Sequence, residues 1–169
     1  MPELPEVETT IRYLGKKVNG KKIVSIKKSN KRLRKNLNLD DLYSIKGKRI
    51  IEVKRFAKYI LVKLNSQSFL IIHLGMSGRL KFYLKENYQK EKHDHVVLEF
   101  DRFYVVFNDP RRFGMFFKLN NNELKSFFNN YGLDLLVDKI NISEISNKFK
   151  KKSVSLKQAL LDQSIFVGL

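Results

Sequence analysis

The 169-residue sequence contains no cysteine and no tryptophan, and only three prolines and eight glycines. Without cysteine, the chain can form neither a disulfide nor a thiolate-ligated zinc or iron–sulfur site of its own. Long hydrophobic runs are also missing, because segments such as FLII fall far short of the ~20 apolar residues that span a bilayer. We therefore expect an intracellular protein with no membrane partner.

Acidic residues are scarce, since 17 Asp and Glu stand against 34 Lys and Arg, which gives a formal net charge of +17. Such a charge attracts polyanions, so nucleic acid is the leading candidate partner. An AT-rich genome would also raise the lysine content, and the charge therefore needs support from motifs. The hydrophobic fraction of 43%, with 13 Phe and 7 Tyr, is sufficient for one globular core.

Helical and strand-like patterns occupy different parts of the chain. Val7, Ile11, Leu14 and Val18 fall on one stripe, which predicts a helix from about Glu3 to Val18. After Gly20, eight short segments rich in β-branched and aromatic residues predict strands that pair in two packed antiparallel sheets. The predicted fold class is α+β, mainly β, with a two-layer antiparallel β-sandwich, the first helix alongside it and further helices at the end. The eight segments are KIVSIKK, RIIEVKRF, YILVKL, FLIIHL, RLKFYL, HVVLEF, FYVVF and GMFFKL.

Helical spacing returns toward the carboxyl end. The segments NNELKSFFNNYG, ISEISNKFK and SLKQALLDQSIF predict three helices, the last over residues 155–166. We expect residues 1–150 to form a β-sandwich domain and residues 151–169 to begin a helical linker. The apolar ending FVGL predicts that the fold continues into a further domain.

Three of the 17 acidic residues, Glu3, Glu6 and Glu8, lie close together in the opening string MPELPEVETT. Methionine before proline is readily removed, which would expose the secondary amine of Pro2. An α-amino group has a pKa near 8, about two units below that of lysine, so more of it is a free nucleophile at neutral pH. Such an amine can form an iminium with a sugar carbon, and the adjacent Glu3 could supply the proton. The same acids also suit a helix amino terminus, so this string alone decides nothing.

Together with four later segments, MPELPEVETT resembles the formamidopyrimidine-DNA glycosylases, a family of base-excision repair enzymes. The segments RFAKYILV, HLGMSGRL, KHDHVVLEF and DPRRFG occur in the family's order. SLKQALLDQ resembles the helix that leads toward the family's next domain, so the resemblance runs from one end of the chain to the other.

The resemblance implies a bifunctional DNA glycosylase and AP lyase. Such an enzyme removes formamidopyrimidine and 8-oxoguanine from double-stranded DNA and then cleaves the abasic site by β- and δ-elimination. The implied catalytic residues are Pro2 as nucleophile at C1′ of the damaged nucleotide, Glu3 as general acid and Glu6 as a supporting carboxylate. Lys58 is implied to contact a phosphate and to take part in proton transfer.

The resemblance also implies DNA contacts from loops. An enzyme that acts on a base in a duplex extrudes the nucleotide and fills the gap with side chains. Met76 and Phe113 are the implied wedges, and Arg111 is expected to face the orphaned cytosine. Their position beside glycines makes burial awkward, although core positions for Met76 and Phe113 remain the alternative.

Several residues stay open to a second interpretation. Strand alternation would put Lys58 on an otherwise apolar face, where a lysine commonly extends its amine to solvent. His93 and His95 would share one face of a strand, a weak metal signal, and we expect a phosphate contact by His93 and no metal. His73 could be a core histidine or a support for Pro2. Lys151 is the implied phosphate contact of the KKKS run, with Lys152 as the alternative.

Family members of full length continue into a helix–two-turn–helix domain and a four-cysteine zinc finger, neither of which this sequence contains. We therefore expect no cofactor in this chain, weaker specific DNA binding and little excision, because fewer phosphates are neutralised. The expected protein is a monomer in the bacterial cytoplasm, at the nucleoid. The competing interpretations are a non-catalytic basic module that binds DNA or RNA, and a basic ribosome-associated protein.

Overall fold

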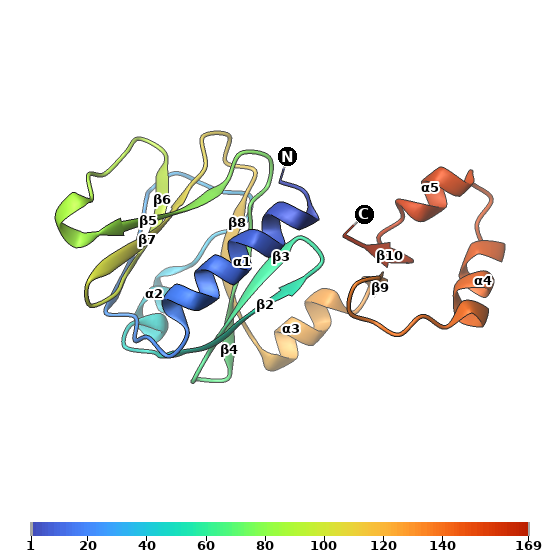
Figure 1. Cartoon of the computed structure of the whole chain (residues 1–169), viewed down its shortest axis with the longest axis horizontal. Helices are drawn as coiled ribbons and strands as arrows, with labels where there is room; N and C mark the ends of the chain where they lie inside the picture. Colours follow the sequence, from blue (N-terminus) through green and yellow to red (C-terminus); the bar gives the residue numbers. More distant parts are fainter. Residues whose placement is uncertain (1, 169) are drawn as a thin grey trace.

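The computed structural model describes residues 2–168 and shows two four-stranded antiparallel sheets packed face to face (Figure 1). The sheets have the strand orders β1-β6-β7-β5 and β2-β3-β4-β8, which confirms the predicted sandwich. All eight predicted segments form strands. They are β1 (Ser25–Lys28), β2 (Ile50–Phe56), β3 (Tyr59–Leu64), β4 (Ser68–His73), β5 (Arg79–Leu84), β6 (Asp94–Glu99), β7 (Phe103–Asn108) and β8 (Met115–Asn120).

Helix α1 (Leu4–Val18) lies beside β2 and buries its predicted stripe of four apolar residues. Glu3 is the residue that precedes the helix, and its backbone N–H donates to the Glu6 carboxylate at 2.8 Å. This contact satisfies one of the backbone donors that a helix start leaves unpaired. The first turn of α1 therefore fixes the position of Pro2, the residue before Glu3, relative to the helix.

Two apolar clusters hold the sandwich together. The larger lies between the sheets and against α1, and it includes Ile60, Ile72 and Phe107, none of which is more than 1% exposed. The second lies on the outer face of β3, β4 and β8, where α3 (Asn121–Phe128) covers Tyr59 and Phe117. Burying side chains of this size stabilises the fold by roughly 1.5–3 kcal/mol each.

The carboxyl-terminal residues form a smaller group beyond α3 (Figure 1). It comprises β9 (Leu133–Asp134), α4 (Ile142–Lys150), α5 (Leu156–Leu160) and β10 (Phe166–Val167), and β9 pairs with β10 in parallel. Leu133, Phe149, Ala159 and Phe166 share its apolar cluster. The domain boundary expected after residue 150 stays a prediction.

The helix predicted over residues 155–166 is wrong beyond Leu160. The Asp162 carboxylate accepts the backbone N–H and the hydroxyl of Ser164 at 2.9 and 2.6 Å, which forms a local turn. Such side-chain bonds compete with helix continuation. The chain then enters β10, where Phe166 and Val167 are buried.

The two short strands β9 and β10 escaped the sequence patterns, as did α2 (Leu39–Ile45) and the 3-10 turn η1 (Lys85–Asn87). In α2 only Ile45 is buried, so no apolar stripe marks it, and Asn38 starts it by accepting the N–H of Asp41. None of the helices within residues 2–168 combines the length and apolar character that crossing a bilayer requires.

Candidate active site and nucleic-acid interface

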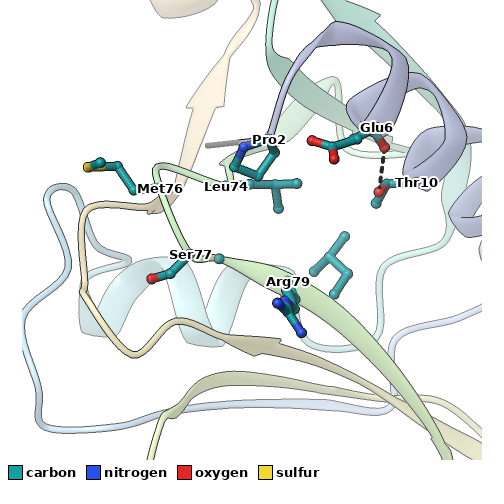
Figure 2. A pocket seen from close by; sticks show the side chains of 9 residues that line it. Pro2, Glu6, Thr10, Leu74, Met76, Ser77 and Arg79 are labelled. Atoms are coloured by element: carbon teal, nitrogen blue, oxygen red, sulfur yellow. Dashed lines mark hydrogen bonds between the residues drawn. The ribbon is translucent and has the colours of Figure 1, made fainter.

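Pro2 lies between two cavities at the amino-terminal end of α1. A groove of about 530 Å³ separates this end of the helix from the turn after β4, and Figure 2 shows Pro2 on its wall between Met76 and Glu6. A second cavity of about 350 Å³ is lined by Pro2 together with Lys58, Tyr59 and His73. A ligand in either space would therefore reach Pro2.

Lys58 and Glu3 form an ion pair at this site, with Nζ donating to Oε2 at 2.9 Å. Lys58 does not lie within a strand, as the alternation pattern predicted, because Phe56 pairs directly with Tyr59 and leaves Ala57 and Lys58 as a two-residue turn between β2 and β3. Its side chain is 16% exposed and is directed toward Glu3 rather than spread over an apolar face. The sequence-based expectation of strand alternation at Lys58 is therefore wrong.

Glu3 is held in its ionised form. The hydrogen bond and the charge of Lys58 lower the pKa of the Glu3 carboxyl below its ordinary value of 4.5. At neutral pH the side chain is therefore a carboxylate, and it must receive a proton before it can act as an acid.

A residue of the carboxyl-terminal group anchors the turn that carries Lys58. Asp134 accepts two hydrogen bonds from the Arg55 guanidinium, at 2.6 and 3.3 Å, and a third from the Ala57 N–H at 3.1 Å. Arg55 also donates to Glu8 on α1 at 3.1 Å. Burial alone would raise the pKa of Asp134, but the bonds from Arg55, Ala57 and Leu136 lower it. The network thus joins α1, the β2–β3 turn and β9.

His73 lines the same cavity as Pro2 while most of its ring is covered. Its Nδ1 accepts the Gly75 N–H at 3.0 Å, and its ring centre lies 4.8 Å from that of Tyr59. Burial, followed by the charges of Arg34 and Lys58, lowers the pKa of the imidazole. A neutral ring with Nδ1 accepting carries its proton on Nε2. His73 is therefore both a packed residue and a wall of the cavity.

Asp109 connects the two loops that border the site. Its carboxylate is fully buried and accepts the Ser77 hydroxyl at 2.5 Å, the Arg111 N–H at 3.2 Å and the Gly114 N–H at 2.8 Å. The loop after β4 and the loop between β7 and β8 are thereby fixed relative to each other.

Met76 and Phe113 are surface residues on these two loops, 42% and 48% exposed. Both line a hollow of about 530 Å³ that Arg34 and His73 also border. The Arg111 guanidinium lies over the Phe113 ring, 5.1 Å from its centre. The alternative that these two residues belong to the core is therefore wrong. Met76, Arg111 and Phe113, the candidate probing residues, lie on two adjacent loops that Asp109 holds together, and we call these the probing loops.

The expected histidine pair does not share a strand face. His93 lies in the turn before β6, whereas His95 is buried in β6 between the Ser29 hydroxyl at 3.0 Å and the Asp109 carbonyl at 2.9 Å. A register shift between Asp94 and Val96 separates them. Within residues 2–168, no three His, Asp or Glu side chains come together in a way that could hold a metal ion.

Two candidate DNA contacts lie apart from Pro2, because neither His93 nor Lys151 lines one of the two cavities that Pro2 borders. Lys151 follows α4 and is exposed. The alternative, Lys152, is committed to an ion pair with Asp162 at 2.7 Å. His93 accepts the Asp109 N–H through its carbonyl at 3.0 Å, so it adjoins the loop that carries Arg111.

Other residues at the site carried no sequence motif. Arg34 borders both the Pro2 cavity and the Met76 hollow, and the basic run KRLRK was the signal that could have found it. Tyr131, which follows α3, and Gln163 of the carboxyl-terminal group also line the Pro2 cavity. Only the three-dimensional contact between distant segments brings them there.

Comparisons with known proteins agree with this arrangement. A family model described as the formamidopyrimidine-DNA glycosylase N-terminal domain matches residues 1–116. Formamidopyrimidine-DNA glycosylases of Wolbachia pipientis (strain wPip) and Zymomonas mobilis are 40% and 41% identical to the chain over 172 residues. These alignments cover all of this chain and 62% and 63% of the relatives, so the chain spans less than two thirds of their length.

Solved structures show the same fold. The Lactococcus lactis enzyme, bound non-covalently to DNA with an abasic site, superposes with a TM-score of 0.89 and is 28% identical. The same enzyme in complex with DNA that contains FAPY-dG gives a TM-score of 0.88. Both alignments cover 99% of this chain, and 65% and 63% of the solved chains.

Proposed function

Because the chain belongs to the formamidopyrimidine-DNA glycosylase family, we propose that it acts on damaged DNA in base-excision repair, as a glycosylase with an associated AP lyase activity. The observation that carries the proposal is the position of Pro2, between two cavities and beside the Glu3–Lys58 ion pair. The proposed partner is double-stranded DNA with an oxidised purine or an abasic site. The Lactococcus lactis enzyme binds DNA that contains FAPY-dG or an abasic site in its solved complexes.

The proposed chemistry uses the secondary amine of Pro2. Its lone pair forms a bond to C1′ of the nucleotide while the bond from C1′ to the base breaks, and the base leaves with the electron pair and takes up a proton. Opening of the sugar ring converts the adduct to an iminium, which acidifies the C2′ proton. Loss of that proton expels the 3′ phosphate, and a second elimination expels the 5′ phosphate.

Removal of Met1, which this chemistry requires, falls outside the described residues and is part of the proposal. The ionised Glu3 then has two successive tasks. It first accepts a proton from the Pro2 ammonium, which frees the nucleophile, and it then delivers a proton to the ring oxygen of the sugar. The ammonium of Lys58 at 2.9 Å keeps the carboxylate charged until that transfer and can contact a neighbouring phosphate. Glu6 supports the turn through its bond to the Glu3 N–H.

The remaining candidate residues serve DNA placement. Met76 and Phe113 enter the base stack, and Arg111 pairs with the base left opposite the extruded nucleotide. His73, His93 and Lys151 contact phosphates. No cofactor takes part in these steps. The proposed location of the chain is the bacterial cytoplasm.

Trapping of the iminium by borohydride on a duplex with an abasic site tests the proposal. The chain should form a covalent adduct that maps to Pro2, a chain whose Pro2 nitrogen is blocked by acetylation should form none, and Pro5→Ala, which alters the first turn but not the terminal amine, should retain it. The mass of the mature amino terminus is measured beside each reaction. If a chain that starts at Pro2 binds the duplex but is never trapped, the competing function as a non-catalytic nucleic-acid-binding module is correct.

A further inference from the structure

A groove lined by lysines lies on the outer face of the β1-β6-β7-β5 sheet, away from the Pro2 cavities. Along β1 and β6, Ile26 and Leu98 point into the core, so their neighbours Lys27 and Val97 point outward. Two cavities of about 260 and 460 Å³ adjoin there and share Lys28 and Lys90. The lysine groove, as we define it, is formed by Lys27, Lys28, Lys31, Lys90 and Lys92.

The loop on one side of the lysine groove has a fixed structure. Tyr88 packs its ring against Tyr83 and Tyr104, with centres 5.4 and 5.0 Å apart. Asp94 accepts the Tyr88 hydroxyl at 3.1 Å and the Glu91 N–H at 2.9 Å. Lys90 and Lys92 flank Glu91 in the sequence, so these contacts hold the backbone that presents both lysines. If these lysines reflected only an AT-rich genome, the loop that carries them would not need these fixing contacts.

The acidic side chains of the lysine groove are already neutralised or saturated. Asp94 also accepts the Asn108 amide at 2.8 Å, Glu91 pairs with Lys81 at 2.7 Å, and Glu99 pairs with Lys85 at 2.7 Å. The five groove lysines are exposed, and in the part of the chain that the structure describes none of them is paired with a carboxylate. The groove is therefore a surface of net positive charge, suited to a polyanion.

The lysine groove begins next to the loop that carries Arg111. Ser29, which follows Lys28, donates its N–H to the His95 carbonyl at 2.8 Å, and Asp109 donates its N–H to the His93 carbonyl at 3.0 Å. The segments at 28–31, 90–95 and 109–114 therefore meet at one edge of the sandwich. A duplex held by the candidate probing loops would continue past this edge.

We propose that the lysine groove binds the phosphodiester backbone of the DNA arm that extends beyond the Asp109–Gly114 loop. This inference rests on the proposed function, and it adds a second, sequence-independent contact that lengthens the DNA footprint of the chain. Duplex DNA fits better than an unpaired strand, because binding of single strands relies on open aromatic faces, and the Tyr83, Tyr88 and Tyr104 rings are packed against each other.

Two variants of equal charge test the inference. The groove variant carries Lys28→Gln, Lys31→Gln, Lys90→Gln and Lys92→Gln. The control carries Lys16→Gln, Lys21→Gln, Lys22→Gln and Lys46→Gln, exposed lysines around the far end of α1, a helix of 15 residues that is roughly 22 Å long. Affinity is measured against salt on two duplexes with an uncleavable abasic analogue, each with one long and one short arm, on opposite sides of the lesion.

The groove variant should lose about 0.9 units of the slope of log affinity against log salt for each phosphate contact removed. The loss should occur on only one of the two duplexes, and the control variant should show no such asymmetry. An equal loss on both duplexes, or the same loss in both variants, overturns the inference, as does a groove variant weakened only on single-stranded DNA or RNA. Failure of the proposed function is seen separately, because the unaltered chain then gives no trapped adduct. In that case the affinity of both variants is measured on undamaged duplex DNA, where the groove variant must bind more weakly than the control.

Discussion

Asp134 accepts hydrogen bonds from both the Arg55 guanidinium and the Ala57 N–H, so a residue of β9 holds the turn on which Lys58 sits. Only 1% of Asp134 is exposed, and 6% of the Arg55 side chain. The segment after residue 130 is therefore part of the structure that places the candidate catalytic lysine, although it lies outside the sandwich.

Replacing one partner of this buried pair should be costly. Asp134→Asn retains the shape of the side chain but leaves the Arg55 charge without its closest partner, and we expect a loss of about 3–5 kcal/mol in the free energy of unfolding. Glu8→Gln removes the other, partly exposed carboxylate from Arg55 and should cost under about 1 kcal/mol. Urea unfolding monitored by circular dichroism measures both. Equal losses would show that Asp134 is not the main anchor.

The contribution of Asp134 should depend on pH in the acidic range. Its pKa is lower in the folded chain than in the unfolded chain, where Asp titrates near 3.9, so the stabilisation is complete above that value and is lost as pH falls through the folded pKa. The stability difference between the unaltered chain and Asp134→Asn should therefore be constant near neutrality and shrink below about pH 4. A difference that persists unchanged at pH 3 would contradict the charge-based origin of the effect.

Glu3 should matter for chemistry and not for stability, because its pairing with Lys58 is exposed to solvent. We expect Glu3→Gln to slow adduct formation by about 10²–10⁴-fold, the usual contribution of a positioned proton-transfer group, with an unchanged unfolding midpoint. Glu52→Gln, which removes an exposed carboxylate paired with Lys54, serves as the control and should alter neither. Single-turnover trapping kinetics give the rates. A drop in the midpoint that parallels the drop in rate would assign Glu3 a structural role instead.

The close approach of the two probing loops depends on Gly75. A methyl group there would lie 2.6 Å from the Gly114 nitrogen, and the residue has a φ of 63°. Gly20 has a similar φ of 76° but open space around it, so Gly20→Ala should cost only the roughly 1–2 kcal/mol of a left-handed alanine. Gly75→Ala should cost more and also weaken binding to an abasic duplex. Identical effects of the two substitutions would mean that the loops are not in obligatory contact.

The sheet layout could be predicted from sequence because each strand carries its own local signal. Alternation and turn residues mark every strand of the sandwich, and the four apolar positions of α1 mark the buried side of that helix. Local patterns fail where a distant segment decides the structure. Nothing in RFAKYILV shows that Ala57 has a φ of 50° in a two-residue turn, or that distant Asp134 accepts its N–H.

The same distinction between local signals and distant contacts applies to the residues of the candidate site. Pro2, Glu3, Lys58 and Met76 were found from motifs. Pro2 shares one cavity with Met76 and another with Lys58, and Lys58 forms an ion pair with Glu3. Arg34 was missed because a basic run resembles an ordinary charged surface until its position beside His73 is known. The expectation that His93 and His95 share one strand face was wrong because an H-x-H string does not reveal where β6 begins or that its register shifts between Asp94 and Val96.

Met76 and Phe113 provide the test that separates base extrusion from the chemistry at Pro2. Both side chains are about half exposed, so the double variant Met76→Ala and Phe113→Ala should change the free energy of unfolding by no more than about 0.5 kcal/mol. In a duplex, extrusion must overcome stacking and pairing, whereas an abasic site in a single strand needs no wedge. Trapping on duplex DNA should therefore fall strongly while trapping on the single strand is retained.

As a control, Val24→Ala and Leu84→Ala remove exposed apolar side chains elsewhere and should leave trapping on both substrates unchanged. Equal losses on duplex and single strand would place the two residues in the chemical step or in general DNA binding, and not in a wedge.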